Sequence, residues 1–320
     1  NKGRALEGKW NVPTYRTVGE LLGADSAQFA VTCVPWEANP LLIRELVGRG
    51  VAVLSETPPA SDVQGLREMW SLVAQGARIQ VAEQYIYQPH HAVRLAFVAS
   101  GALGTISQAQ VSAAHGYHGI SLIRHYLGIG YENARITAYA FTSPLVAGPG
   151  RSGPPIEERT AASKQTIARL DFGDRLGVYD FSGDQYFSWI RNERLLVRGE
   201  RGEIAGQEAT YLRDFDEPIE IAFKRQVAAP HRSLEGLYLK GILAGERWLY
   251  RNPFVPARLA DDEIAVATSL QGMTDYLQGG PEVYPLAEAC QDRYLDILIA
   301  QAVESSQVVE SESQVWAEAG

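Results

Sequence analysis

Residues 29–59 read FAVTCVPWEANPLLIRELVGRGVAVLSETPP, and this stretch decides the fold. The apolar run 29–34 is typical of a buried strand that ends at Pro35, and residues 37–47 carry apolar side chains at helical spacing. A pair of glycines ends that helix, and residues 51–54 supply a second apolar strand. A strand, a helix and a strand in succession predict parallel strands joined by a crossover helix.

The same alternation continues downstream. Asp62 is typical of a helix N-cap, a helix is expected from there to Gly76, and residues 79–82 read as a third strand. Three strands linked by two helices predict a parallel sheet covered by helices. We therefore expect a first α/β domain over residues 1–87.

From residue 88 the pattern changes to an α+β domain that runs to residue 320. Ala168, Leu170 and Phe172 alternate with polar residues, which predicts antiparallel strands, and Gly173 suits a tight hairpin turn. A Pro/Gly-rich loop is expected over 144–155, further strands at 105–111, 186–190, 195–198 and 219–223, and helices at 91–98, 117–127 and 286–303.

Composition excludes several classes of partner. The chain has 320 residues, with 29 Lys and Arg against 38 Asp and Glu, and a formal net charge of −9. Such a chain is not attracted to nucleic-acid phosphates or to an anionic membrane. No apolar run reaches the roughly 18 residues of a membrane span. Cys33 and Cys290 lie far apart without metal-ligand spacing, so we expect a reducing, cytoplasmic location and neither a disulfide nor a thiolate zinc site.

In open parallel sheets, ligands bind beyond the carboxyl ends of the strands, which here are the loops 35–39, 55–59 and 83–89. These loops resemble those of the Gfo/Idh/MocA family of NAD(P)-dependent sugar and cyclitol oxidoreductases. Members show a strand that ends in Thr-Pro, then Glu-Lys-Pro, then an Asn/Gln-x-Arg-Phe-x-Pro stretch. Pro35 and Glu56 reproduce the family's step of 21 residues between the first two motifs, and residues 84–89 fit the third.

The resemblance continues beyond the three loops. Residues 101–106 are similar to the family's Gly-x-Leu-Gly-x-Ile, and 118–128 are similar to its His-x-x-Asp helix. The resemblance is close over about 100 residues. Over the rest of the chain it rests only on the order of the helices and strands. It implies an α/β fold in which an incomplete Rossmann-type parallel sheet domain is followed by an α+β domain with a large, mostly antiparallel, open sheet.

Departures from the family pattern change the expected chemistry. Thr57 stands where members have the Lys of Glu-Lys-Pro, and a threonine hydroxyl cannot act as a base near neutral pH. Ala114 and Ser121 replace two Asp residues, and Ile86 replaces the Arg of the third motif. His118 alone keeps an ionisable group. Because a hydroxyl must lose its proton as its carbon loses hydride, His118 is the expected base.

The resemblance implies NAD or NADP as cofactor and a small sugar or polyol as substrate. The residues it implies are catalytic His118 and Thr57, cofactor-binding Pro35, Trp36, Asn39, Glu56, Pro58 and Gln84, and substrate-binding Tyr85, Tyr117 and Ser121. Alternatives from the residues themselves stay open: Glu56 is a cofactor ligand or a strand-end carboxylate, Thr57 orients a ligand or caps a turn, and Trp36 stacks on a ring or only packs. Asn39 is a binding group or a first-turn helix residue next to Pro40, and Tyr117 donates to a substrate hydroxyl or only packs. No metal site is expected.

The resemblance also implies a strand, a Gly-x-Gly-x-x-Gly turn and a helix before Asn1, which carry the pyrophosphate of the cofactor. Two explanations are open: the sequence is a fragment of a longer protein, or it is a relative without cofactor. The expected function is hydride transfer between NAD(P) and a sugar-like polyol. The alternatives are a non-catalytic sugar-binding or scaffolding relative and an NAD-assisted glycoside-eliminating enzyme. A dimer or tetramer formed through the open sheet is the expected assembly.

Overall fold

A computed structural model describes residues 2–24, 26–228 and 236–319, and the chain folds into two compact units. The first unit comprises residues up to Ala82 together with Gln271–Leu286, and the second comprises Glu83–Leu270 and residues from Ala287 onward. Within the described ranges, no helix combines the length and the apolar character that crossing a membrane requires.

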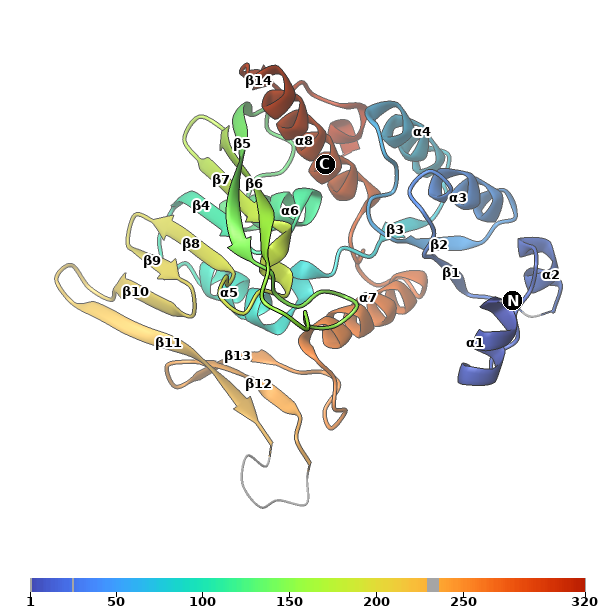
Figure 1. Ribbon diagram of the computed structural model, residues 1–320, viewed down its shortest axis with the longest axis horizontal. Coiled ribbons are helices and arrows are strands. Elements are labelled where there is room, and N and C mark those ends of the chain that lie inside the picture. Colours follow the sequence, from blue (N-terminus) through green and yellow to red (C-terminus); the bar gives the residue numbers. More distant parts are fainter. Residues whose placement is uncertain (1, 25, 229–235, 320) are drawn as a thin grey trace. The chain divides into compact units, whose positions relative to one another are not determined.

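The first unit contains a three-stranded parallel sheet in the order β1-β2-β3, which confirms the predicted parallel arrangement (Figure 1). Ala52, Val53, Leu54 and Ser55 are all buried, as expected for a central strand covered on both faces. Its elements are α1 (Lys2–Trp10), α2 (Val18–Ala24), β1 (Phe29–Thr32), α3 (Asn39–Gly48), β2 (Ala52–Ser55), α4 (Val63–Ala74) and β3 (Ile79–Val81).

Local signals explain where the two crossover helices begin. Helix α3 starts at Asn39 with Pro40 in its first turn, where proline's fixed φ suits a helix and its missing N–H costs nothing. Helix α4 has Asp62 as its N-cap, and the carboxylate accepts a hydrogen bond of 2.8 Å from the backbone N–H of Gly65. The start of α4 follows the sequence prediction, whereas α3 begins two residues later than the predicted residue 37.

A late segment of the chain completes this unit. The buried side chain of Gln80 accepts hydrogen bonds from the backbone N–H groups of Val283 (2.9 Å) and Tyr284 (3.1 Å). Its amide donates to Glu282 Oε1 at 2.9 Å, and Val81 donates to the carbonyl of Tyr284. Residues 271–286 are thus tied to the edge of β3, about 200 residues away in sequence.

The second unit is built on a sheet of eleven strands within the described residues, in the order β13-β12-β11-β10-β9-β8-β4-β7-β6-β5-β14. Only β4 and β7 pair in parallel, so the expected large, mostly antiparallel sheet is confirmed. The strands are β4 (Ile106–Ser112), β5 (Arg135–Val146), β6 (Thr160–Asp171), β7 (Leu176–Ser182), β8 (Arg194–Gly199), β9 (Gly202–Ala205), β10 (Glu208–Leu212), β11 (Pro218–Val227), β12 (Leu239–Ala244), β13 (Arg247–Arg251) and β14 (Val309–Glu310).

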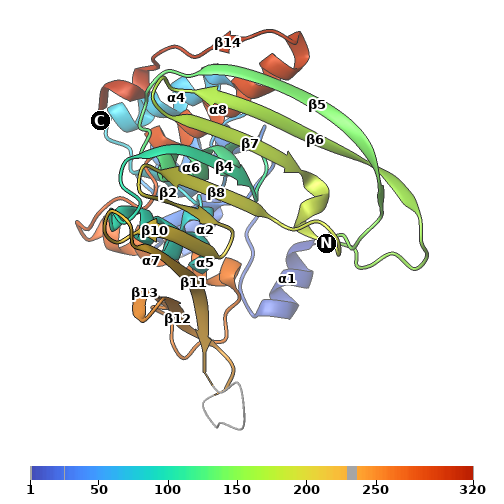
Figure 2. The same cartoon turned by 90° about the vertical axis from the view of Figure 1, so that its left-hand side faces the viewer.

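Helices cover one face of this sheet and leave the other open (Figures 1 and 2). On the open face, β5 presents the exposed side chains of Tyr139 and Phe141. The buried indole of Trp316 donates to Gln291 Oε1 at 2.9 Å and anchors the C-terminal segment. The remaining elements are η1 (Tyr85–Tyr87), α5 (Pro89–Ala99), α6 (Gly116–Leu127), η2 (Gly183–Tyr186), α7 (Asp261–Leu277), α8 (Leu286–Ser305) and η3 (Val315–Ala319).

Two predicted elements are wrong. Residues 186–190 form no strand, and the helix η2 ends at Tyr186. The side chain of Gln185 accepts from the backbone N–H of Ser182 (2.9 Å) and donates to Ser112 Oγ (3.0 Å). These two hydrogen bonds hold the chain in a turn. The loop expected from residue 144 begins later, since β5 continues through Pro144 to Val146. Proline fits there because β14 covers only the other end of β5, at residues 135–136, so no neighbouring strand needs the missing N–H.

Candidate functional site

All of the predicted cofactor residues except Gln84 lie in the first unit, in or directly after the loops that follow its parallel strands. Asn39 is buried at the start of α3, and its Nδ2 donates to Ser55 Oγ at 3.0 Å and lies 3.4 Å from the carbonyl oxygen of Pro58. Asn39 therefore links the loop after β1 to the loop after β2. Trp36 and Pro35 are exposed in the first of these loops.

Glu56 and Thr57 differ in exposure although they are neighbours. Glu56 is exposed, and its backbone N–H donates to the carbonyl of Thr32, while Thr57 is 8% exposed and precedes a cis peptide bond to Pro58. A buried hydroxyl in this place can orient a group by hydrogen bonding, but it offers no proton acceptor near neutral pH.

Two polar atoms at these strand ends lack hydrogen-bond partners within the part of the chain that the structure describes. They are Thr32 Oγ1, at the last residue of β1, and Asn39 Oδ1, and both are buried. Buried polar atoms in proteins are nearly always satisfied, so unpartnered ones at a ligand-binding edge fit a group that brings its own donors. The amide and hydroxyl groups of a dinucleotide supply such donors. Ahead of β1, the described residues form the helices α1 and α2.

In the second unit, His118 lies on the first turn of α6 and is paired with a buried carboxylate. Its Nδ1 is 2.5 Å from Glu83 Oε2, and the two residues are 5% and 2% exposed. The other oxygen, Glu83 Oε1, accepts from the backbone N–H of Tyr85 at 3.1 Å. A carboxylate oxygen can only accept a hydrogen bond, so in its neutral form the imidazole of this pair carries its proton on Nδ1 and its lone pair on Nε2.

Close packing fixes the beginning of α6. Gly116 has φ of 44°, and a Cβ built on it would lie 2.7 Å from Asp296 Oδ1. A Cβ on Gly119 would lie 2.6 Å from the ring of Tyr179. Gly119 has no room for a side chain beside the Tyr179 ring and the carbonyl of Ala114, and the positive φ of Gly116 favours glycine at the start of the helix that carries His118.

Aromatic rings surround His118. The centroids of Tyr85, His115 and Tyr117 lie 4.6, 4.9 and 4.5 Å from its own. The hydroxyl of Tyr186 accepts from the backbone N–H of His115 at 2.9 Å and lies 2.7 Å from its Nδ1. The Tyr85 hydroxyl is 3.3 Å from that of Tyr186. The site thus presents phenol hydroxyls beside an imidazole.

Burial changes how these groups ionise. Desolvation, followed by the charge of His118, lowers the pKa of His115 to about 4. Desolvation also raises the pKa of Tyr85 well above its usual value, and the neighbouring Tyr186 and Glu83 add to this. Near neutral pH, His115 is therefore uncharged, and Tyr85 is a phenol that can donate a hydrogen bond.

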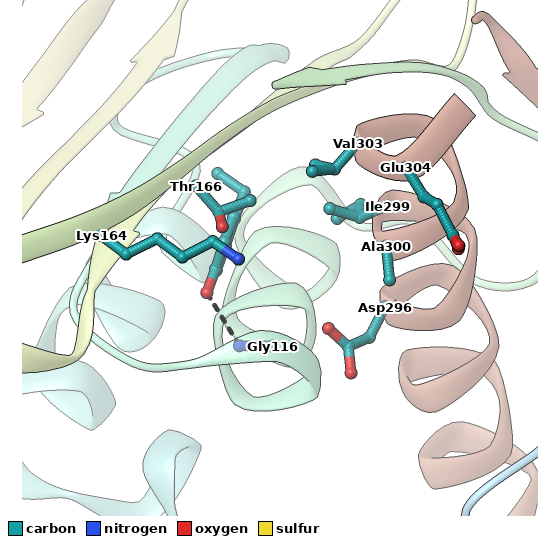
Figure 3. Close-up of a pocket in the computed structure, with 9 residues that line it drawn as sticks. Gly116, Lys164, Thr166, Asp296, Ile299, Ala300, Val303 and Glu304 are labelled. Atoms are coloured by element: carbon teal, nitrogen blue, oxygen red, sulfur yellow. Dashed lines mark hydrogen bonds between the residues drawn. The ribbon is translucent and has the colours of Figure 1, made fainter. Parts of the chain in front are cut away.

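A cavity of about 420 Å³ lies beside the start of α6. Figure 3 shows residues that line it. Lys164 reaches towards it from β6, and Asp296 comes from α8 on the opposite wall. Tyr179 also lines the cavity, and its hydroxyl accepts from the backbone N–H of Gly116 at 2.8 Å. Burial raises the pKa of Asp296, while Arg293 and His118 act in the opposite direction. The cavity is large enough for a small polar molecule and carries both a cation and a carboxyl group.

The structure therefore brings the predicted His118, Tyr85 and Tyr117 together and buries Ser121 one turn further along α6. Gln84 lies just before η1 in the second unit. The residues that sequence reasoning missed are Glu83, Lys164, Tyr186 and Asp296. A buried acid directly after a strand is the one signal that could have singled out Glu83.

Comparisons with known proteins indicate the fold. No model of a protein family matches the sequence, and no curated protein matches it. Solved structures do match. An NAD-binding oxidoreductase from Klebsiella pneumoniae is 16% identical with a TM-score of 0.67, and the match covers 98% of this chain and 88% of that one.

Two further structures carry bound cofactor. GenD2 from gentamicin A biosynthesis, in complex with NAD, is 18% identical with a TM-score of 0.63 over 97% of this chain and 86% of that one. An oxidoreductase from Agrobacterium radiobacter, in complex with NAD+, L-tartaric acid and magnesium, is 14% identical with a TM-score of 0.63 over 96% and 87%. This chain thus has the fold of NAD-binding oxidoreductases, the fold that its resemblance to the Gfo/Idh/MocA family implies.

Proposed function

We propose that this protein is an NAD(P)-dependent oxidoreductase that acts on a hydroxyl-bearing carbon of a sugar-like polyol. The observation that carries the proposal is the buried pair of His118 and Glu83 in a chain with this fold. Oxidation of an alcohol needs a group that accepts the hydroxyl proton, and a neutral imidazole held by a carboxylate is suited to that task.

His118 accepts the hydroxyl proton at Nε2, and Glu83 stabilises the imidazolium that results. Glu83 also holds the ring in one orientation, because both of its oxygens are hydrogen-bonded. Tyr85 and Tyr117 orient the substrate hydroxyls by hydrogen bonding and stacking. Ser121 lies on α6, the helix that also carries Tyr117 and His118. Bulky rings around the imidazole exclude water, which favours proton transfer to and from the substrate.

The cofactor residues lie in the first unit. A bound nicotinamide supplies the acceptor for hydride. Asn39 and Thr32 offer buried polar atoms to such a group, and Pro35, Trp36, Glu56, Thr57 and Pro58 form the loops around them. Gln84 is proposed to orient the nicotinamide ring.

Binding of NADH and NADPH, followed by fluorescence, tests the proposal. We expect saturable binding of at least one of them, and oxidation of polyols in a substrate panel. His118→Gln should lower kcat by at least about a hundredfold, because the proton acceptor is lost. His125→Gln is the matched control, since His125 lies on the same helix and its Nδ1 is 2.8 Å from the carbonyl oxygen of Ser121 in its own turn. Unchanged turnover in His118→Gln contradicts the assignment.

Thr57 favours a second candidate, a sugar-binding relative without catalysis. Its buried hydroxyl stands where the family has an ionisable amine. This candidate predicts that polyols bind while millimolar NADH and NADPH do not. Such a result excludes the oxidoreductase and leaves the sugar-binding protein.

A further inference from the structure

A cluster of three potential metal ligands lies at the start of α5. His90, His91 and Glu193 each place one ligand atom within 4.8 Å of the others. His90 Nε2 is 3.4 Å from Glu193 Oε2. Two ligand atoms on one tetrahedral zinc ion lie about 3.3 Å apart, given bond lengths of about 2.0–2.1 Å. We propose that His90, His91 and Glu193 bind a divalent transition-metal ion of the zinc type.

His91 is prepared to act as a ligand. It is fully buried among the helices of the second unit. Its Nε2 has no hydrogen-bond partner within residues 2–24, 26–228 and 236–319. Its Nδ1 is 3.1 Å from the Tyr126 hydroxyl, which can accept from Nδ1–H and so leave the lone pair of Nε2 for the ion.

His90 has the outer partner that metal-binding histidines usually have. Its Nδ1 is 3.3 Å from Asp261 Oδ2, and Asp261 is itself held by Arg225 through two hydrogen bonds of 2.7 Å. A carboxylate that accepts from Nδ1–H leaves the lone pair of Nε2 for the ion and fixes the ring. Nε2 is the atom that faces Glu193.

The charge balance of the site includes one buried cation. Arg94 lies 3.5 Å from Glu193 Oε1 through Nη2 and 3.4 Å from His91 Nδ1 through Nη1, and its Nε donates to the carbonyl of Gly206 at 2.9 Å. It therefore pairs with the oxygen of Glu193 that does not face His90. Two imidazoles and one carboxylate favour zinc over magnesium, which prefers oxygen ligands.

The site has access to a cavity of about 420 Å³. His90 and Glu193 line it together with Tyr85, Tyr186 and Asp262. Three protein ligands with a fourth position left open are typical of zinc sites that bind water or a small ligand. The ion would thus be separated from the His118 site by Tyr85, which lines this cavity and also contacts His118.

Zinc titration of the chelator-stripped protein tests the inference. We expect one Zn2+ per chain by calorimetry and elemental analysis, and the visible absorption of four-coordinate Co2+ when cobalt is used instead. Glu193→Gln and His90→Gln should each weaken binding at least tenfold, because each removes a ligand. The controls are His125→Gln and Cys33→Ser, which remove a histidine and the exposed thiol outside the cluster and should bind as the wild type does.

Thermal melts without metal establish that each variant is folded before its affinity is compared. Absence of stoichiometric binding at millimolar Zn2+ overturns the inference. So does wild-type affinity in both Glu193→Gln and His90→Gln, because the ion would then lie elsewhere. Both results are independent of whether the protein binds NAD(P).

Discussion

The buried Glu83 is the side chain on which the behaviour of His118 depends most directly. Glu83→Gln keeps the size of the side chain but removes its charge. The amide can also bond to Nδ1 through its N–H, which would place the imidazole proton on Nε2. We expect kcat to fall by about 10²–10⁴-fold with little change in the melting temperature. Steady-state kinetics with the exposed Glu246→Gln as control would measure this, and equal rates in both variants would reject the role of Glu83.

His115 makes stability depend on pH. Its pKa is about 4 in the folded chain and near 6.5 in an unfolded one, because folding desolvates the ring. Between these values the unfolded chain binds more protons, so stability falls as pH is lowered from 6.5 to 4 and is unaffected by this group above 6.5. The melting temperature of His115→Gln should therefore decrease less over this window than that of the wild type. Parallel curves for the two proteins would contradict the prediction.

At the scale of elements, the link between β3 and residues 271–286 depends on one side chain. Gln80→Ala leaves the backbone N–H groups of Val283 and Tyr284 without their acceptor in a buried place. We expect a loss of about 1–3 kcal/mol in the free energy of unfolding, measured by denaturant titration. The exposed Gln278→Ala is the control, and an equal effect of both changes would show that the link contributes nothing.

The elements that the sequence predicts well are those with their own periodicity or caps. Helix α4 follows from Asp62 and its apolar spacing, and the β6–β7 hairpin follows from Gly173, whose φ of 92° the turn requires. The strand predicted at residues 186–190 is wrong. The aromatic residues there follow a strand-like pattern, but the hydrogen bonds of the Gln185 amide determine the local backbone conformation. That amide bonds to Ser112, a residue that no local pattern connects with it.

The candidate site was predictable only in part, because its side chains are brought together by contacts between segments that are distant in the sequence. His118 follows from the resemblance, since it stands at the family's histidine position. Its partner Glu83 is 35 residues away on another element, and the pair exists because the loop before η1 packs against α6. The cluster of His90, His91 and Glu193 likewise joins α5 to the loop after η2, so spacing along the chain could not reveal it.

At the scale of the whole molecule, the open face of the large sheet is the proposed surface for self-association. Tyr139 is 59% and Phe141 46% exposed on β5, and apolar patches on open sheets mark interaction surfaces. Phe141→Asp should convert the expected dimer or tetramer to a smaller species in light scattering coupled to size exclusion. Thr137→Asp, on the same face of β5 without apolar loss, is the control. A wild-type chain that runs as a monomer would refute the prediction.

The discontinuous first unit has a consequence for biosynthesis. A ribosome makes β1, β2 and β3 before residue 82, yet the partners of Gln80 lie at residues 282–284. The edge of β3 therefore lacks these hydrogen-bond partners until residues 83–270 of the second unit have been synthesised. The unit whose strands are translated first is completed only by a segment made near the end of synthesis.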